Sequence, residues 1–157
     1  RPQNPTRPYP YQEQEVAYSG GITGTRLVGT LSLPAGDGPF PAALLISGSG
    51  PQDRDETVFY HRPFRILADH LVRRGIAVLR VDDRGFGAST GDFAPATTED
   101  FVDDALSGFA FIVLLAGPGV SGADVLTLQQ GAISSSEGVD PAVWLRSPST
   151  GHARPST

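Results

Sequence analysis

The amino-acid sequence predicts a three-layer α/β protein, in which helices cover both faces of a mostly parallel sheet that begins with an antiparallel hairpin. Three observations lead to this prediction. Apolar and polar residues alternate in two short segments on either side of Ser19-Gly20-Gly21, as in a β-hairpin. Three later runs of strand length are apolar throughout, as expected for strands buried on both faces. Segments with the helical spacing of apolar residues alternate with these runs.

The expected strands follow from these patterns in chain order. The two hairpin strands are followed by a loop rich in Gly and Pro, and then by the apolar runs AALLI, IAVLRV and FAFIVLL. The five expected strands are residues 13–18, 25–33, 42–46, 76–81 and 109–115.

The expected helices lie between and after the apolar runs. Phe64 and Leu71 share one face of the first helix, and Gly75 suits its C-terminus. Thr97 or Thr98 can cap the second helix. The three expected helices are residues 62–74, 97–107 and 124–134.

The chain is expected to form one domain with two flanking segments. Its 157 residues are enough for a single hydrophobic core, which we place in a truncated domain at residues 13–134. Residues 1–12 are Pro-rich and polar, and are interpreted as an extended N-terminal arm or linker. Residues 135–157 are rich in Ser, Pro and Gly, and are interpreted as a weakly structured tail.

The composition excludes several classes of partner. The chain has 12 basic and 17 acidic side chains and a formal net charge of −5, so nucleic acid is not an expected partner. No apolar run is long enough for a membrane-spanning helix, and no signal peptide is visible. The absence of cysteine excludes disulfides and thiolate ligands. We expect a soluble protein whose compartment the sequence does not fix, with export from a bacterium as an open alternative.

No metal or cofactor is expected. Asp53, Asp55 and Glu56 could hold a cation, but a solvated loop, or one paired with Arg54, is the simpler interpretation. The residues after Gly48-Ser49-Gly50 break the dinucleotide-binding pattern, and the chain has no P-loop lysine.

Residues 87–91 read Gly-Ala-Ser-Thr-Gly and are the only G-x-S-x-G in the chain. This pattern is typical of serine hydrolases, whose nucleophile lies on a sharp turn between a strand and a helix. Here the expected strand ends at Val81, well before Ser89, and the residues after Gly91 are typical of a loop. Ser89 is therefore a candidate nucleophile, with a turn residue that bonds its own loop as the alternative.

Three longer strings resemble a known family: GDGPFPAALLISGSGPQDRDE, GIAVLRVDDRGFGASTGDF and IVLLAGPGV. They are similar to bacterial α/β-hydrolase-fold carboxylesterases related to dienelactone hydrolases and serine peptidases. The resemblance covers about residues 1–130, and SGSGPQDRDE is its most specific part. It implies a serine-type hydrolase of small carboxylic esters, esterase- or lipase-like, with an oxyanion-hole amide at Ser49 or Gly50.

The same resemblance implies a truncated hydrolase. In that family the nucleophile lies in a G-H-S-E-G-G elbow, on a strand that follows the helix expected here at residues 97–107. This elbow is missing, because the chain passes from that helix directly into residues 109–115. The later segments that carry the family's catalytic acid and His have no counterpart either.

The shortened fold leaves an open edge and a second candidate serine. Residues 109–115 can take the lost strand's place beside residues 42–46, and such an apolar edge predicts self-association into an oligomer. Ser121 would then lie between a strand and a helix, where its alternative role is a helix N-cap.

Two functions stay open at this point. In the first, Ser89, Asp124 and His152 follow the Ser-Asp-His chain order of α/β hydrolases and hydrolyse a small ester, with Ser121 as the alternative nucleophile. In the second, the chain is a catalytically inactive hydrolase fragment that at most binds a ligand or associates with itself.

Overall fold

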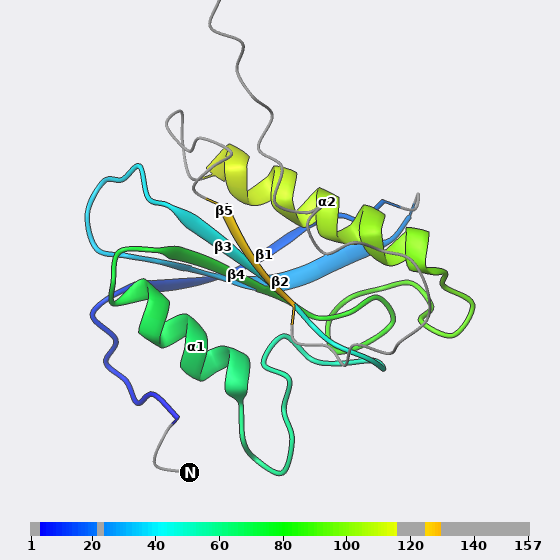
Figure 1. Ribbon diagram of the computed structural model, residues 1–157, viewed down its shortest axis with the longest axis horizontal. Coiled ribbons are helices and arrows are strands. Elements are labelled where there is room, and N and C mark those ends of the chain that lie inside the picture. The colour runs from blue at the N-terminus through cyan, green and yellow to red at the C-terminus, as the bar shows by residue number, and fades with distance from the viewer. Residues whose placement is uncertain (1–3, 22–23, 116–124, 130–157) are drawn as a thin grey trace, which may run out of the picture.

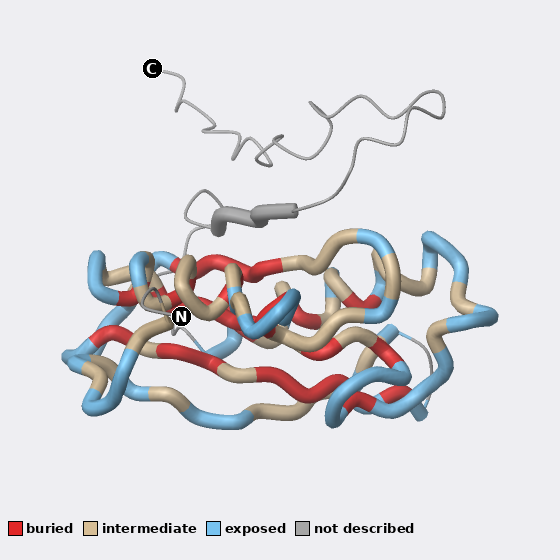
Figure 2. Tube along the Cα trace, turned by 90° about the horizontal axis from the view of Figure 1, so that it is seen from below, coloured by how far each residue is buried: buried red, intermediate tan, exposed pale blue. Residues whose placement is uncertain are grey.

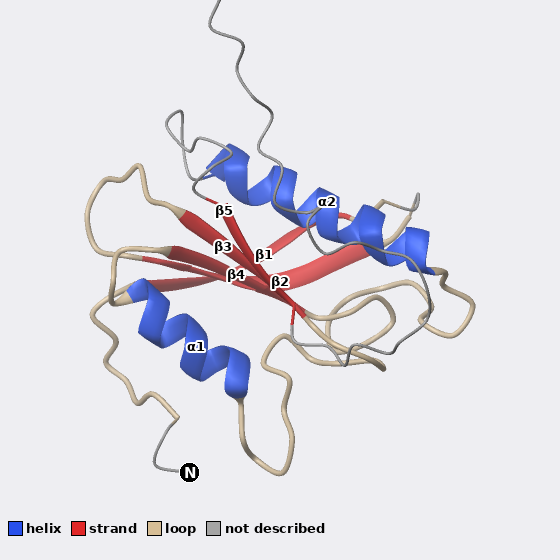
Figure 3. Ribbon diagram, in the orientation of Figure 1, coloured by secondary structure: helices blue, strands red, loops and turns tan. Residues whose placement is uncertain are grey.

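The computed structural model describes residues 4–21, 24–115 and 125–129. Its strands form one five-stranded sheet with α1 against one face and α2 against the other, so the predicted three-layer α/β architecture is confirmed (Figure 1; Figure 3). The elements are β1 (Gln12–Ser19), β2 (Arg26–Leu33), β3 (Ala42–Ile46), α1 (Pro63–Val72), β4 (Ala77–Val81), α2 (Thr98–Leu115) and β5 (Val125–Gln129).

The sheet is antiparallel on one side and parallel on the other. Its strand order is β1-β2-β4-β3-β5. β1 and β4 both pair antiparallel with β2, whereas β3 lies parallel between β4 and β5. The predicted hairpin and the predicted strands at residues 42–46 and 76–81 are thus confirmed. Because β3 and β4 are parallel, their carboxyl ends meet at the same edge of the sheet.

Helix α1 confirms the helix predicted at residues 62–74. It begins at Pro63, whose fixed φ and missing amide suit the first turn of a helix. Phe64, Ala68 and Val72 follow at four-residue spacing and are buried against the sheet.

Residues 4–11, which belong to the segment interpreted as an arm, lie along α1. Tyr9 and Tyr11 stack with their ring centroids 5.0 Å apart. The Tyr11 hydroxyl donates a hydrogen bond of 2.9 Å to Asp69, and Arg65 donates one of 2.5 Å to the Tyr9 hydroxyl. The described part of the arm is therefore held against the helix by both packing and hydrogen bonds.

The predicted strand at residues 109–115 is wrong, because these residues continue α2 beyond the second predicted helix. Gly108 does not end the helix. A Cβ atom at Gly108 would lie 2.5 Å from the Tyr18 hydroxyl oxygen, so glycine here lets α2 approach β1 closely. Ile112 lies one turn later and is 0% exposed. An apolar run of this length is compatible with either a strand or a helix. Residues 109–115 are helical because they extend the buried stripe that begins in the earlier turns of α2.

The predicted helix at residues 124–134 is also wrong, since Val125–Gln129 forms strand β5. β5 pairs in parallel with β3 over its whole length. Without it, the backbone groups on one side of the buried strand β3 would lack partners in the sheet. β5 therefore occupies the place that was expected for residues 109–115, and it forms the edge of the sheet on that side.

Each face of the sheet has its own apolar core, and Figure 2 shows buried segments in the interior with exposed segments around the periphery. Side chains alternate between the two faces along a strand, so β3 and β4 contribute to both cores. This two-sided burial explains their continuous apolar sequences. The core under α1 contains Ala43, Leu45, Phe64, Ala68, Val72 and Val78, and the core under α2 contains Leu31, Ala42, Leu44, Ala77, Leu79 and Ile112.

A group of charged residues lies beside the core under α1. Arg80 on β4 is 1% exposed, and it donates hydrogen bonds to Asp55 and, at 2.9 Å, to Glu13 on β1. Arg65 on α1 lies 3.7 Å from Asp55 and 3.9 Å from Glu13. The expectation that Asp55 would be solvated or paired with Arg54 is therefore wrong. Two cations and two anions instead join β1, β4, α1 and the loop before α1.

Replacing Arg80 with Met is expected to lower the free energy of unfolding by about 3–5 kcal/mol, because Asp55 and Glu13 would stay buried without their main cation. Urea unfolding at pH 7 measures the loss. Arg73→Ala is the matched control, since Arg73 pairs with Asp69 at the surface and a surface ion pair contributes little. An equal loss of unfolding free energy in both variants would contradict the assignment of Arg80 as the main cation of the buried charged group.

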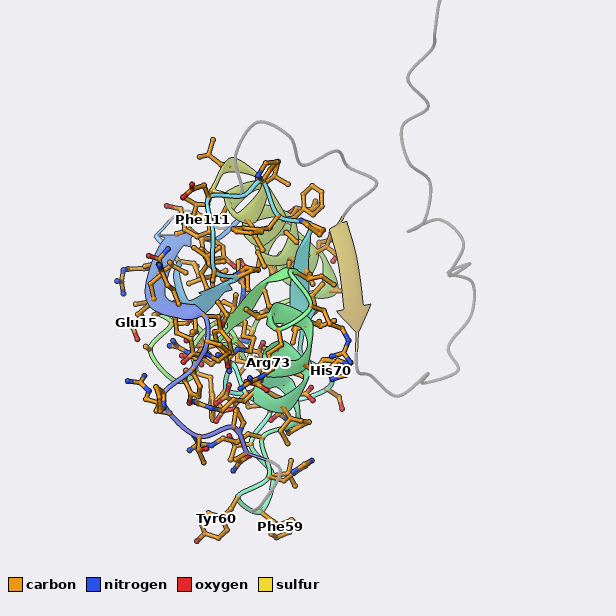
Figure 4. The ribbon with its side chains drawn as sticks, turned by 90° about the vertical axis from the view of Figure 1, so that its left-hand side faces the viewer. Glu15, Phe59, Tyr60, His70, Arg73 and Phe111 are labelled. Carbon is orange, nitrogen blue, oxygen red and sulfur yellow. The ribbon has the colours of Figure 1, made fainter. Side chains whose placement is uncertain are left out.

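The loop before α1 contains a tight turn that bulky residues rarely form. The backbones of Val58 and His61 exchange hydrogen bonds of 2.9 and 2.8 Å. Between them, Phe59 and Tyr60 have φ values of 45° and 64°, in the left-handed region that hairpin turns usually fill with Asn and Gly. Their side chains are 85% and 86% exposed and extend from the tip of the loop (Figure 4). The backbone strain here is not offset by burial of the rings.

Tyr60→Gly is therefore expected to raise the free energy of unfolding by about 1 kcal/mol, because glycine adopts this φ without a steric cost. Val58→Gly is the control, since Val58 does not have a positive φ and glycine there only adds entropy to the unfolded chain. Thermal unfolding of both variants checks the prediction. A Tyr60→Gly protein no more stable than the parent would refute it.

Candidate functional site

A pocket of about 340 Å³ opens at the carboxyl ends of β3 and β4. Its walls come from residues 47–50 after β3, from residues 82–84 after β4, and from residues of α2. Ligand sites of open α/β sheets lie at this edge, where loops rather than strands surround the ligand. The structure places Ser49 and Gly50, the predicted oxyanion-hole residues, in this pocket.

The loop after β3 brings backbone amides to the pocket. The Gly48 amide donates a hydrogen bond of 2.9 Å to the Glu56 side chain. The Ser49 and Gly50 amides donate none to any residue that the structure describes. Two such N–H groups beside an apolar pocket can bind a carbonyl or carboxylate oxygen. Their role as an oxyanion hole stays a prediction.

Asp82, which follows β4 and is 3% exposed, holds this loop in place. Its carboxylate accepts three hydrogen bonds from Arg54: one from the backbone amide at 2.7 Å, one from Nε at 3.0 Å and one from Nη2 at 2.7 Å. The Ala88 amide donates a fourth, at 3.0 Å. A Cβ atom on Gly87 would lie 2.5 Å from the same carboxylate, so the first glycine of the G-x-S-x-G pattern makes room for Asp82.

Asp83 holds the start of the same loop, and its electrostatics differ from those of Asp82. The Ser47 hydroxyl donates to Asp83 at 2.5 Å, and the Gln52 amide donates at 2.8 Å. Burial raises the pKa of Asp83 above its ordinary value. Burial alone would also raise the pKa of Asp82, but its hydrogen bonds, chiefly those from Arg54, hold that pKa below its ordinary value.

Arg84 fastens the pocket to α2. It is 3% exposed, donates a hydrogen bond of 2.7 Å to Asp104, and lies 5.5 Å from the centroid of the Phe101 ring. Asp82, Asp83 and Arg84 are adjacent in the sequence, but the structure gives each of them a partner in a different place. Asp82 binds Arg54, Asp83 binds the start of the loop after β3, and Arg84 binds α2.

Ser89 lies outside the pocket lining and is 8% exposed. Its hydroxyl donates a hydrogen bond of 2.8 Å to the backbone oxygen of Asp82 and accepts one of 2.9 Å from the Val28 amide. The next residue, Thr90, accepts a hydrogen bond of 2.7 Å from the Arg26 amide. These contacts fasten the loop to β2, as the turn interpretation of Ser89 expects.

The other members of the predicted catalytic set, Asp124, His152 and the alternative nucleophile Ser121, lie outside the described residues. Among residues 4–21 and 24–115, no serine is hydrogen-bonded to a histidine. Over the described chain there is also no cluster of three or more residues suited to hold a metal. None of its helices is long and apolar enough to cross a membrane.

Sequence reasoning missed Tyr18, which lines the pocket from the end of β1. Burial raises the pKa of its hydroxyl well above the usual range. The alternation of apolar and polar residues along β1 predicted a strand but gave no signal that Tyr18 reaches the pocket.

Asp82→Asn is expected to lower the free energy of unfolding at pH 7 by about 2 kcal/mol, because Arg54 loses its counter-ion. The folded-state pKa of Asp82 is lowered, so its carboxylate contributes stability above the unfolded pKa of about 3.9. This contribution to stability is lost as pH falls through the lower, folded-state pKa of Asp82. Urea unfolding at several pH values should therefore show a constant difference from the parent near neutrality that narrows in acid.

Asp83→Asn is the matched control, for which the stability difference from the parent should change with pH in the opposite direction. The raised folded-state pKa of Asp83 means that the parent loses stability as pH rises from the unfolded pKa through the folded one. The asparagine variant lacks this loss, so its free energy of unfolding relative to that of the parent should increase as pH rises. The same direction of pH dependence in both variants would contradict the two assignments.

Residues 23–115 match the family described as X-Pro dipeptidyl-peptidase (S15 family). Esterase EstD of Thermotoga maritima is 34% identical over 99 residues, which cover 63% of this chain and 23% of EstD. Esterase FrsA of Yersinia enterocolitica is 38% identical over 82 residues, which cover 52% of this chain and 18% of FrsA. The chain thus matches less than a quarter of the length of either relative.

Solved structures agree on the fold. Hypothetical protein PA2218 from Pseudomonas aeruginosa superposes with a TM-score of 0.60 at 20% identity, over 80% of this chain and 36% of that one. Esterase Est22 superposes with a TM-score of 0.57 at 16% identity, over 76% of this chain and 35% of that one. Since the family match covers more than half of its length, the chain belongs to the X-Pro dipeptidyl-peptidase (S15) family, and its fold is that of esterase-like α/β hydrolases.

Proposed function

We propose that this chain hydrolyses carboxylic esters, with the ester carbonyl oxygen bound by the Ser49 and Gly50 amides. The proposal is carried by one observation: Ser49 and Gly50 line the pocket, and their amides donate no hydrogen bond to any described residue. The resemblance of the chain to two proteins named as esterases supports the same reaction. In acyl transfer, such donors stabilise the negative charge that develops on the carbonyl oxygen.

The pocket favours a small substrate. A volume of about 340 Å³ lies at the lower end of the range for small-molecule sites, roughly 300–1,000 Å³. Leu27, Ile46, Phe93 and Phe101 give it apolar walls that suit a short acyl or alcohol group. We therefore propose short-chain esters as the substrate class.

The rigid support of the amides suits them to this role. Asp82 binds Arg54 with three hydrogen bonds, and Asp83 binds both Ser47 and Gln52, so the loop is fixed on both sides of Gly50. Donors that are already in position need no reorganisation when the oxyanion forms. The donors would thus be oriented before the ester enters.

We propose Ser121 as the nucleophile because the Ser89 hydroxyl is engaged by Asp82 and Val28 outside the pocket. In the sequence Ser121 follows helix α2 and precedes strand β5, so the strand-to-helix context expected for it is wrong, and the proposal rests on the engagement of Ser89. We propose His152 as the base and Asp124 as its orienting acid. The serine oxygen would attack the carbonyl carbon while the base takes its proton, and the alcohol would leave with that proton. Water, activated by the same base, would then release the carboxylic acid from the serine.

A fluorophosphonate probe tests the nucleophile. It should label the chain at Ser121, found by mass spectrometry of the digest, and Ser121→Ala should lose both the label and the turnover of p-nitrophenyl acetate. Ser89→Ala is the matched control: it should stay labelled and lose stability by about 1 kcal/mol, because it removes two hydrogen bonds.

Two results would decide against the proposal. An adduct on Ser89 would move the nucleophile to the G-x-S-x-G loop. No adduct and no turnover of acetate or butyrate esters, in protein that unfolds cooperatively, would make the chain an inactive hydrolase fragment. An X-Pro p-nitroanilide, assayed beside the esters, separates ester from dipeptidyl-peptide hydrolysis.

A further inference from the structure

The outward face of α2 is apolar over its second half. Residues 105–115 contain no charged side chain. Gly108 and Ile112 face the sheet and are buried. On the opposite side of the helix, Leu106 is 54% exposed and Leu114 is 80% exposed, with exposed Ala110 between them.

These exposed residues form one continuous stripe. Leu106, Ala110 and Leu114 are four residues apart, so they lie one above another along the helix. The same stripe continues toward the N-terminus of α2 through exposed Asp103 and Glu99. The outward face is therefore apolar at one end and acidic at the other. At the acidic end the hairpin turn at Gly21 lies close to Asp103, whereas Leu106, Ala110 and Leu114 stay exposed among the described residues.

We propose that two copies of this chain associate through this stripe, with their α2 helices antiparallel and a two-fold axis at Ala110. Ala110 is equally distant in sequence from Leu106 and Leu114. In the antiparallel pair, Leu106 therefore packs against Leu114 of the partner subunit, and the reverse contact forms by symmetry. The small alanine side chains at the axis let the two helices approach closely.

The distribution of charge selects the antiparallel arrangement. The acidic residues of the stripe, Glu99 and Asp103, both lie in the N-terminal half of α2. Parallel helices would bring the two acidic halves together, where like charges repel. Antiparallel helices place them at opposite ends of the contact, and the helix dipoles then also oppose each other.

The size of the contact predicts a reversible dimer. A contact of three helical turns buries less than the roughly 800 Å² per partner of a standard stable interface. We therefore expect a dimer in the micromolar range, which dissociates on dilution. The proposal does not depend on the hydrolase reaction, and it replaces the association through a strand edge that was expected for residues 109–115.

Disulfide cross-linking tests the geometry, because the natural chain contains no cysteine. Ala110→Cys should form a covalent dimer under mild oxidation, since the two Cβ atoms meet at the axis. Asp103→Cys is the matched control on the same stripe. In the antiparallel pair its two copies are about 21 Å apart along the helix axis, so it should stay monomeric on a non-reducing gel. Cross-linking of Asp103→Cys but not Ala110→Cys would overturn the proposal.

Charge substitutions test the same contact in solution by sedimentation velocity over a concentration series. Leu106→Lys combined with Leu114→Lys should weaken association at least tenfold, because like charges then face each other. Leu106→Lys combined with Leu114→Glu should restore it, since each lysine faces a glutamate in the antiparallel pair alone. Phe59→Lys, at an exposed site far from α2, should leave association unchanged.

Circular dichroism of each variant confirms that the fold survives these exposed substitutions. A parent chain that stays monomeric up to about millimolar concentration, or a double-lysine variant that dimerises like the parent, would overturn the proposal. Either result would mean that another segment or another protein covers the stripe.

Discussion

The pocket depends on the carboxylate of Asp82. This one side chain accepts hydrogen bonds from the backbone and side chain of Arg54 and from the Ala88 amide, so it ties the loop after β3 to the loop after β4. The two loops leave adjacent parallel strands, and the hydrogen bonds of Asp83 to Ser47 and Gln52 add a second link between them. The low pKa of Asp82 is the electrostatic consequence, because its neighbours favour the charged form.

Other parts of the structure follow from this contact. Gly87 is required because a side chain there would collide with Asp82, and Ser89 is drawn into the same loop by the Asp82 backbone oxygen. The G-x-S-x-G pattern therefore has a structural explanation that involves no catalysis. Its glycine gives space to a carboxylate, and its serine fastens a loop to β2. The proposed oxyanion hole lies instead on the neighbouring Gly48-Ser49-Gly50 loop, which lines the pocket.

The sequence predicted those features that local patterns determine. Alternation around Gly20-Gly21 identified the hairpin, and the spacing of Phe64 and Leu71 identified α1. The pocket could also be located, since Gly-rich segments follow both β3 and β4. The partners of Asp82, Asp83 and Arg84 could not be predicted, because each is set by an element distant in sequence. The predicted catalytic residues Asp124 and His152 lie outside the described residues, and their roles stay a prediction.

The run FAFIVLL shows why the rest could not be predicted from pattern alone. Seven apolar residues suit a strand buried on both faces as well as a helix, and only the neighbours decide. Here Tyr18 on β1 and the turn before Gly108 already hold a helix in place, so continuing it requires no new nucleation. The place beside β3 is then left for β5. The second half of α2 is apolar on all sides, but the sheet can bury only the side that faces it. Leu106 and Leu114, on the other side, are therefore exposed.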